Sequence, residues 1–540
     1  MDTRQFIRGV EAEIDARFAS SGLKDVGYAQ AMWTLLAVNE DNYLAHLHRL
    51  RDEEMHIYAD TRMNALTHPL RVCFEECVAG TDPVRFELID RDYELAREWL
   101  DAAEDYDQFC SMFPMWHRGR LDIAIVNNRL VVQNPSNADK RAEAYNRMVR
   151  KEARPDPPVS RADGALIDAI LASTTIGTDW FRLNFNPRLV ARIMEFLGPA
   201  MDARYSLPNE WTFNSFSLQQ YRRIFLAIQS LMYAWHVARN VLANSGMPAL
   251  GYKSSIWVVP RQELSARLHR YSGIDTAVVE RAIDLLAFGA QVSRPDIATQ
   301  PLVDLRNGTY ALSPFIWLNT NMERNLCVLL NQIPTERERY SILSNEKEVT
   351  TRREIIEALD SLGYDFRSGE VEGTNLDLAV IDHANKACLC LELKWFIEPA
   401  EIREIENRTK ELAKGVMQCK LINSLFGRQD ERLIKSVLGI EANYLFLSAV
   451  GSVNWIGFGD VQDADVPIIK VMHLVNKIVE SGSLTVSIEW LKVRGYLPKE
   501  GRDYSIIPME ISSGEWCATW YGVKPSDDDG GGLESSPTSE

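Results

Sequence analysis

The residues best suited to chemistry lie in one short segment, Ala387 to Phe396, which reads Ala-Cys-Leu-Cys-Leu-Glu-Leu-Lys-Trp-Phe. Alternate side chains of a strand point to the same face, so Glu392 and Lys394 would share one face while the intervening leucines occupy the other. Cys388 and Cys390 precede the two charged residues on their face. A glutamate and a lysine in an otherwise apolar strand are costly to bury unless they serve each other or a third charge. The pattern therefore predicts a functional charge pair.

A third charge, Asp377, lies near the start of the preceding predicted strand, Gly373 to Asp382. A turn at His383 to Lys386 would pair the two strands as a hairpin and bring Asp377 beside Glu392. Two adjacent carboxylates raise each other's pKa unless a divalent cation lies between them. A lysine beside such a cation can orient or deprotonate an attacking water. We therefore expect metal-assisted hydrolysis.

The combination of Asp377 with Glu392-Leu393-Lys394 resembles the PD-(D/E)XK nuclease superfamily, which has the restriction-endonuclease-like fold. The resemblance covers about residues 345 to 450 and includes the expected preceding helix, predicted over Thr351 to Leu362. Leu376 stands before the aspartate where many members have proline, a position at which the superfamily is loose. The resemblance implies an α/β nuclease core, a mixed sheet flanked by helices, in the C-terminal half of the chain.

The resemblance also implies roles for these residues. Asp377, Glu392 and the backbone carbonyl of Leu393 would hold one Mg²⁺ or Mn²⁺ ion. Lys394 would position the water that attacks a phosphodiester.

Related nucleases often carry a further acid on the helix before the first strand, and Glu348, Glu354 and Glu357 are available here. At 100° per residue, Glu348 lies about 20° from the core residue Leu359, whereas Glu354 lies about 140° away. Glu348 is therefore the expected ligand, provided that the helix begins before it.

The helix predicted after the lysine strand, Pro399 to Phe426, would carry a residue that touches the phosphate or the site. Gln418 is the nearest match, and it shares a helix face with Lys410 and Lys414. The fuller pattern of RecB-type enzymes has a tyrosine where Ile422 stands. An ordinary surface glutamine is the alternative.

Composition limits the classes of function that remain. The 540 residues contain 76 Asp and Glu against 59 Lys and Arg, a formal charge of −17, which excludes a polybasic nucleic-acid binder. Eight scattered cysteines do not form a disulfide scaffold. The N-terminus has no apolar signal region, and no apolar run is long enough to span a membrane. We expect a cytoplasmic protein with no membrane partner.

The boundaries expected along the chain are a mostly α-helical domain with a small β-hairpin over 1–152, a helical domain over 160–330, a nuclease-like domain over 340–524 and a disordered acidic tail over 525–540. Ala153 to Val159, rich in proline, is the expected first linker. Residues 257–314 have the order helix, turn, helix and hairpin of a winged-helix-like element. This order is also found in packing domains that bind no DNA.

The expected function is a metal-dependent endonuclease that acts on nucleic acid, with DNA the expected substrate, in restriction or anti-phage defence. The N-terminal region would select the substrate or a partner protein, or form a homodimer. Two alternatives stay open: a catalytically inactive nuclease-fold scaffold or interaction protein, and a DNA repair or junction-processing nuclease. The absence of a G-x-x-x-x-G-K-[ST] loop argues against a built-in NTPase motor.

Overall fold

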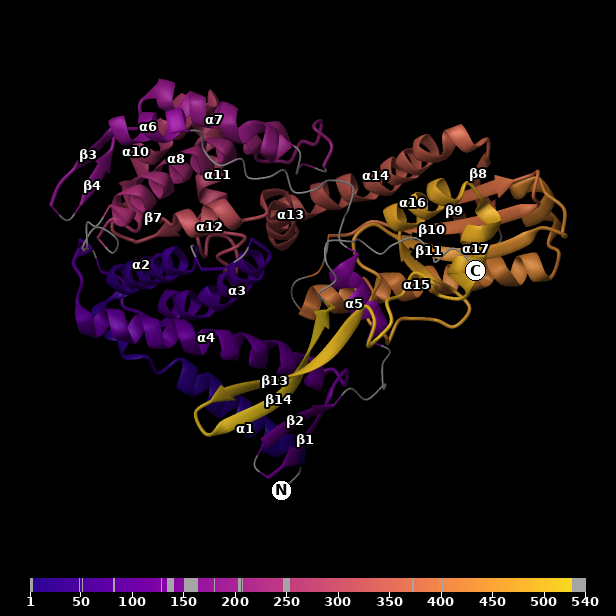
Figure 1. The fold of residues 1–540 in the computed structure, drawn as a ribbon, viewed down its shortest axis with the longest axis horizontal. Helices are drawn as coiled ribbons and strands as arrows, with labels where there is room; N and C mark the ends of the chain where they lie inside the picture. Colours follow the sequence, from indigo (N-terminus) through magenta and orange to yellow (C-terminus); the bar gives the residue numbers. More distant parts are fainter. Residues whose placement is uncertain are drawn as a thin grey trace. The chain divides into compact units, whose positions relative to one another are not determined.

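The computed structural model is shown in Figure 1. It describes residues 3–47, 49–50, 52–80, 83–127, 129–133, 140–149, 164–178, 180–202, 205, 207–245, 253–371, 373–397, 399 and 402–526. The linker expected at 153–159 lies outside the described residues. So does most of the tail expected at 525–540, but its first residue, Pro525, is the last residue of strand β14 (Trp516–Pro525) rather than part of a tail. The chain forms two compact units: a helical unit of Met1–Phe113, Arg154–Leu343 and Ser512–Trp516, and a sheet unit of Pro114–Ala153, Ser344–Ile511 and Cys517–Glu540.

These units divide the chain differently from the expected boundaries, because residues 114–153 belong with the C-terminal part rather than with a domain over 1–152. The hairpin of β1 (Asp122–Val126) and β2 (Arg129–Gln133) is present as predicted. Its second strand, however, pairs in parallel with β14 (Trp516–Pro525), almost 400 residues later. Such a long-range pairing leaves no trace in local sequence periodicity.

The short helix α5 (Arg141–Met148) joins the same unit through its polar side chains. Tyr145 Oη lies 2.9 Å from His473 Nδ1, and the Asn146 side chain donates to the Gly457 carbonyl at 2.8 Å. Asn146 also accepts a hydrogen bond from the Ile456 backbone N–H at 3.0 Å. These bonds fix α5 to the sheet unit.

The centre of the sheet unit is a five-stranded sheet of order β12-β11-β10-β9-β8. Strands β8, β9 and β10 are antiparallel neighbours, whereas β11 and β12 run parallel to β10. The elements in chain order are the second part of α14 (Pro334–Leu359), η2 (Asp360–Leu362), β8 (Asp365–Val371), β9 (Thr374–Asp382), β10 (Ala387–Lys394), α15 (Ile402–Gly427), η3 (Arg432–Leu438), β11 (Leu445–Ser452), β12 (Ile468–Lys470), α16 (Val471–Ser481), α17 (Leu484–Lys492) and β13 (Tyr504–Ser513).

Strand β10 is central and has the two faces that its period of two predicts. Leu389 and Leu391 pack in one core cluster with Ile488 of α17, whereas Cys388 and Cys390 pack in another with residues of α15. Figure 1 shows helices on both sides of this sheet. The mixed α/β architecture expected for the C-terminal part is therefore present. Strand β8 was not predicted, because its exposed residues and Gly369 hide the strand pattern.

The helical unit contains α1 (Thr3–Phe18), η1 (Gly22–Val26), α2 (Tyr28–Leu47), α3 (Asp52–Glu76), most of α4 (Asp90–His117), α6 (Gly164–Ala172), β3 (Thr174–Ile176), β4 (Phe181–Leu183), α7 (Pro187–Asp202), α8 (Leu218–Asn244), β5 (Trp257–Pro260), α10 (Arg261–Ser272), α11 (Thr276–Leu286), β6 (Val303–Asp304), β7 (Thr309–Leu312), α12 (Pro314–Asn319), α13 (Met322–Gln332) and the start of α14. In the described part of the chain, no helix has the length and hydropathy needed to span a membrane.

The winged-helix-like element has its predicted helices and hairpin. Helix α10 ends at Gly273, whose φ of 69° is left-handed, and α11 begins with Asp275 capping the Ala277 N–H. Strand β5 adds to the hairpin in a three-stranded sheet of order β5-β7-β6. With α8 before it, the full order is helix, strand, helix, helix and two strands.

The contacts of this element favour the packing role over DNA contact. Arg306, in the turn between β6 and β7, lies 4.0 Å from the Tyr28 ring centroid and donates to the Phe74 carbonyl at 3.2 Å. On α11, Glu280 and Asp284 form ion pairs with Arg261. The turn is thus engaged with α2 and α3, and the exposed side of α11 carries acids that would repel phosphates.

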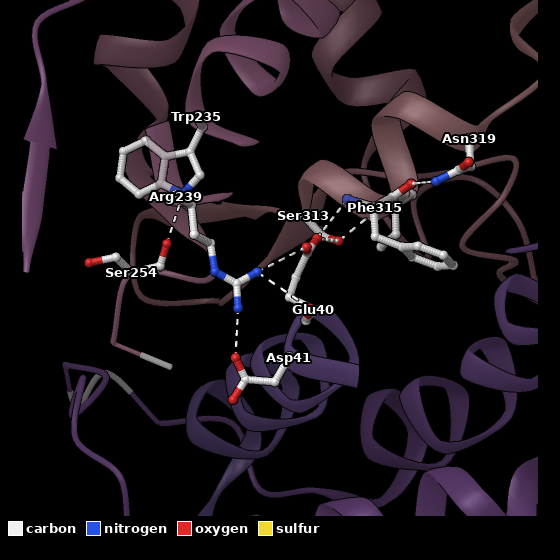
Figure 2. Close-up of polar contacts among 9 residues, drawn as sticks. Glu40, Asp41, Trp235, Arg239, Ser254, Ser313, Phe315 and Asn319 are labelled. Atoms are coloured by element: carbon white, nitrogen blue, oxygen red, sulfur yellow. Dashed lines mark hydrogen bonds and ion pairs between the residues drawn. The ribbon is translucent and has the colours of Figure 1, made fainter. Parts of the chain in front are cut away.

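A buried ion-pair network holds the helical unit together (Figure 2). Arg239 of α8 donates to Asp41 Oδ1 at 2.6 Å and lies 3.4 Å from Glu40 Oε2, both on α2. Glu40 also accepts the Phe315 backbone N–H at 2.6 Å and the Ser313 hydroxyl, at the start of α12. Since Arg239 and Glu40 are almost wholly buried, each needs these partners to offset the cost of leaving water.

The Glu40 network predicts a pH dependence of stability. Burial raises the pKa of Glu40 to about 7, against the opposing effects of Arg239 and of the Ser313 and Phe315 hydrogen bonds. A carboxyl group whose folded pKa is raised stabilises the protein most at low pH and loses that contribution as pH rises through about 7. In Glu40→Gln, the decline of the melting temperature between pH 5 and 8 should become shallower, as followed by circular dichroism. Asp41 leaves a residual slope, because burial raises its pKa too.

The matched control is Glu98→Gln, since Glu98 is exposed on α4 of the same unit. It should keep the wild-type pH profile. If the melting temperature of Glu40→Gln fell with pH as steeply as that of the wild type, Glu40 would not be the source of the pH dependence.

Candidate metal-dependent active site

The candidate site forms where β9 and β10 separate. Their antiparallel ladder ends at the pair Leu391 and Leu378. One step further in the same register stand Glu392 and Asp377, as the hairpin predicted. At this point the Asp377 side chain takes the place of a backbone hydrogen bond between the strands: its Oδ2 accepts the Leu393 backbone N–H at 2.8 Å. The strand register thus places two carboxyl groups side by side at the open end of a hairpin.

Lys394 and Glu392 form a close ion pair on the same face of β10. Lys394 Nζ lies 2.7 Å from Glu392 Oε1, with the two side chains 15% and 2% exposed. The second carboxylate oxygen, Glu392 Oε2, is buried and has no hydrogen-bond partner among the described residues. A buried carboxylate oxygen without a donor is unfavourable, and it is the kind of atom that a cation would stabilise.

Helix α14 supplies the third acid. The helix begins at Pro334, well before Glu348, so the condition set by the sequence is met. Glu348 is half-buried and interacts electrostatically with both Lys394 and Asp377, whereas Glu354 and Glu357 are exposed. Of the three candidate acids, Glu348 is the one that its helical angle turns toward the sheet.

The electrostatics show that these acids compete for one ammonium group. Burial and the Asp377 carboxylate together raise the pKa of Glu392 to about 7, although Lys394 opposes the shift. Burial likewise raises the pKa of Asp377 and of Glu348. Burial alone would lower the pKa of Lys394, but Glu392, Glu348 and Asp377 together raise it. When ionised, these three carboxyl groups outnumber the two cations that act on them, Lys394 and Arg352, and leave an excess of negative charge.

Helix α15 covers the site at close range because of a glycine. A Cβ added at Gly415 would lie 3.3 Å from the Val450 methyl carbons and 3.4 Å from Lys394 Cε. One turn further, Cys419 lies against Glu392: burial raises its pKa to about 12, and the Glu392 carboxylate adds to that effect. Gly415 therefore lets the helix approach the lysine closely.

Gln418 lies at the edge of this arrangement. Its side-chain amide donates to Thr374 Oγ1, at the start of β9, at a distance of 3.5 Å. The structure thus brings Asp377, Glu392 and Lys394 together with Glu348. It places Gln418, on α15, beside Thr374, which precedes Asp377 by three residues on β9.

Two charged residues near the site escaped sequence reasoning. Arg352, one turn after Glu348 on α14, lowers the pKa of Asp377 and donates to Ser368 Oγ at 3.3 Å. Glu411 of α15 raises the pKa of Glu348. Arg352 follows Glu348 by four residues, so the two share a helix face, and this spacing is the one local signal that could have identified Arg352.

Side chains supply only part of the oxygen ligands that a hard divalent cation would need here. Within the described residues, no group of three or more His, Cys, Asp or Glu is arranged to hold a metal ion. Asp377 and Glu392 supply carboxylate oxygens, and Leu393 a main-chain carbonyl. Mg²⁺ commonly binds one or two carboxylates and keeps several waters, so this smaller set suits it. The unpartnered Glu392 Oε2 and the excess negative charge support the same fit.

Comparisons with protein-family models, curated proteins and solved structures find no match to this chain. The chemistry of the site therefore has to be inferred from its own geometry and electrostatics.

The site predicts that divalent cations stabilise the protein. A ligand that binds only the folded state adds about 2.7 kcal/mol at a concentration 100 times its Kd. The melting temperature of the wild type should therefore rise by several degrees in millimolar Mn²⁺ or Mg²⁺ at constant ionic strength. Asp377→Asn and Glu392→Gln should abolish the rise, as measured by differential scanning calorimetry.

Glu354→Gln is the control, because Glu354 is an exposed acid on the same helix as Glu348. It should retain the full rise. A rise of equal size in all four proteins would mean that the cations bind elsewhere.

Proposed function

We propose that this protein is a metal-dependent endonuclease that hydrolyses phosphodiester bonds in DNA, with its active site at Asp377, Glu392 and Lys394. The observation that carries the proposal is the Lys394–Glu392 ion pair beside Asp377, at the end of a hairpin where two strands part. In such an arrangement the carboxylates can hold a cation, and the lysine can position an attacking water.

The order of elements around the site supports this proposal. Helix α14 precedes three antiparallel strands, β8 to β10, and helix α15 leads to the parallel strand β11. The resemblance to PD-(D/E)XK nucleases implies a helix, strands bearing the acids and the lysine, a second helix and a further strand. The same succession is found here from the second part of α14 to β11, within the sheet unit, which supports the proposal.

The residues have distinct tasks in this mechanism. Asp377, Glu392 and the Leu393 carbonyl would hold Mg²⁺ or Mn²⁺, with Glu348 beside them. Such a cation, when bound, stabilises the charge that develops on the phosphate oxygens. Lys394, kept protonated by its three acidic neighbours, donates hydrogen bonds that hold the attacking water in line with the phosphorus. Glu392 in turn holds the Lys394 side chain in position, because its Oε1 accepts a hydrogen bond from Lys394 Nζ at 2.7 Å.

We further propose a cytoplasmic location and a role in restriction or anti-phage defence, with the helical unit selecting the substrate or a partner protein. The contacts of the winged-helix-like element fit partner selection or packing better than DNA binding, because its turn arginine already packs against Tyr28 and Phe74.

One observation favours an inactive scaffold as the second candidate. Lys394 already neutralises one oxygen of Glu392, so the ion pair could serve the fold without any metal. A repair or junction-processing nuclease keeps the same chemistry and differs in preferring branched to linear DNA.

The decisive experiment is cleavage of supercoiled plasmid and linear DNA in Mg²⁺ or Mn²⁺. Positioned acid-base groups contribute about 10² to 10⁴ in rate, so Glu392→Ala and Lys394→Ala should each lower cleavage by at least about 100-fold. Lys435→Ala, which removes an exposed lysine of the sheet unit, should cut like the wild type. Circular dichroism verifies that each variant is folded.

Failure of the folded wild type to cut would be interpreted through metal-binding calorimetry. Binding that is lost in Glu392→Ala would indicate a gated enzyme. No binding at all would contradict the proposal and leave the scaffold.

A further inference from the structure

A groove of about 710 Å³ lies beside the candidate site, between α15 and the start of β9. It is open to solvent. Its lining residues are Gly373, Thr374, Lys410, Ala413, Lys414, Met417 and Gln418. All of them belong to the sheet unit.

The groove and the candidate site share the same two elements. Thr374, in the groove wall, precedes Asp377 by three residues on β9, and Gln418 donates to its hydroxyl. On α15, the groove residue Lys414 is adjacent to Gly415, whose Cα faces Lys394. A chain lying in the groove would therefore run toward the carboxyl groups.

The charge of the groove is opposite to that of the whole chain. The protein carries a net charge of −17, yet this lining contains two lysines and no carboxylate. Lys410 pairs with Glu406 at 3.3 Å and Lys414 with Glu411 at 2.8 Å, with the lysines 64% and 68% exposed. Exposed pairs of this kind contribute only about 0–1 kcal/mol, so phosphates can replace the glutamates at little cost.

The groove also exposes an apolar side chain to solvent. Met417 is 66% exposed, which makes it one of the most exposed large apolar residues described in the sheet unit. Its thioether is flexible and polarisable and makes favourable contacts with aromatic rings. In duplex DNA the bases are stacked inside, so only an unstacked base can lie on this side chain.

We propose that this groove binds a single-stranded segment of DNA, with Lys410 and Lys414 contacting phosphates and Met417 contacting one unstacked base. The groove would deliver that strand to Asp377 and Glu392. The destination of the strand rests on the proposed nuclease function, whereas the binding of the strand does not.

The test is fluorescence anisotropy with the full chain and a labelled oligonucleotide, single-stranded or annealed to its complement, in EDTA so that no cleavage occurs. The wild type should bind the single strand at least tenfold more tightly than the duplex. The double variant Lys410→Ala/Lys414→Ala should lose about tenfold in affinity for the single strand. Its salt dependence, the slope of log K against log salt, should become shallower by about 1.4, or 0.7 for each lost phosphate contact.

Met417→Ala should weaken single-strand binding several-fold with an unchanged salt slope, because the lost contact is uncharged. Two matched controls should behave as the wild type. Lys435→Ala removes an exposed lysine that pairs with Glu431 four residues earlier, as Lys410 pairs with Glu406. Val493→Ala removes an exposed apolar residue elsewhere in the sheet unit.

Equal affinity for single strand and duplex, or equal losses in the groove variants and in Lys435→Ala, would overturn the proposal. The outcome is separable from that of the nuclease proposal. DNA cleavage by the wild type with unchanged binding in the groove variants refutes only the groove. Loss of single-strand binding in those variants, in a protein that neither cuts DNA nor binds a divalent cation, supports the groove and refutes only the nuclease.

Discussion

The sheet unit is organised around one ammonium group that several carboxyl groups share at the point where β9 and β10 part. Lys394 neutralises one oxygen of Glu392 directly, while Asp377 and Glu348 act on both through space. These side chains come from three places in the sequence: α14 carries Glu348, β9 carries Asp377, and β10 carries both Glu392 and Lys394. The register of a hairpin, the angle of a helix and the absence of a side chain at Gly415 must all agree for them to meet. A slip of one residue in β10 would turn Glu392 and Lys394 to the leucine face.

Burial makes this arrangement costly as well as useful. A buried ion pair seldom adds net stability, since desolvation of both charges offsets their attraction. Here the cost of desolvation is not fully compensated. Glu392 Oε2 has no hydrogen-bond donor within the described part of the chain, and the pKa of three carboxyl groups is raised. Apolar packing on both faces of β10 has to supply the stability. Strongly perturbed pKa values of this kind are found most often at functional sites.

The helical unit also buries a carboxyl group, but there hydrogen-bond donors surround it. The buried Glu40 is surrounded by donors, with Arg239, Ser313 and the Phe315 N–H all directed at its oxygens. These partners come from α8 and from the start of α12, so the network fastens both helices to α2, which carries Glu40. The winged-helix-like element is likewise used internally, because apolar residues of β6, β7 and α12 share one core cluster with α2 and α3. These polar groups serve the packing of the helical unit, whereas Asp377, Glu392 and Lys394 of the sheet unit form a charged cluster next to a groove.

The sequence by itself determined the local features of the site. The period of two in β10, the turn before it and the helical angle of Glu348 each depend on residues a few positions apart, and the structure has all three. The helices α10 and α11 and the β1–β2 hairpin could be predicted for the same reason. Only the tertiary structure decided the rest: β8, the place of residues 114–153 in the sheet unit, the approach of Arg352 to Asp377, the position of Gln418 beside Thr374 and the groove next to it. Those features arise from packing between segments far apart in the chain, and neither periodicity nor spacing encodes which segments will meet.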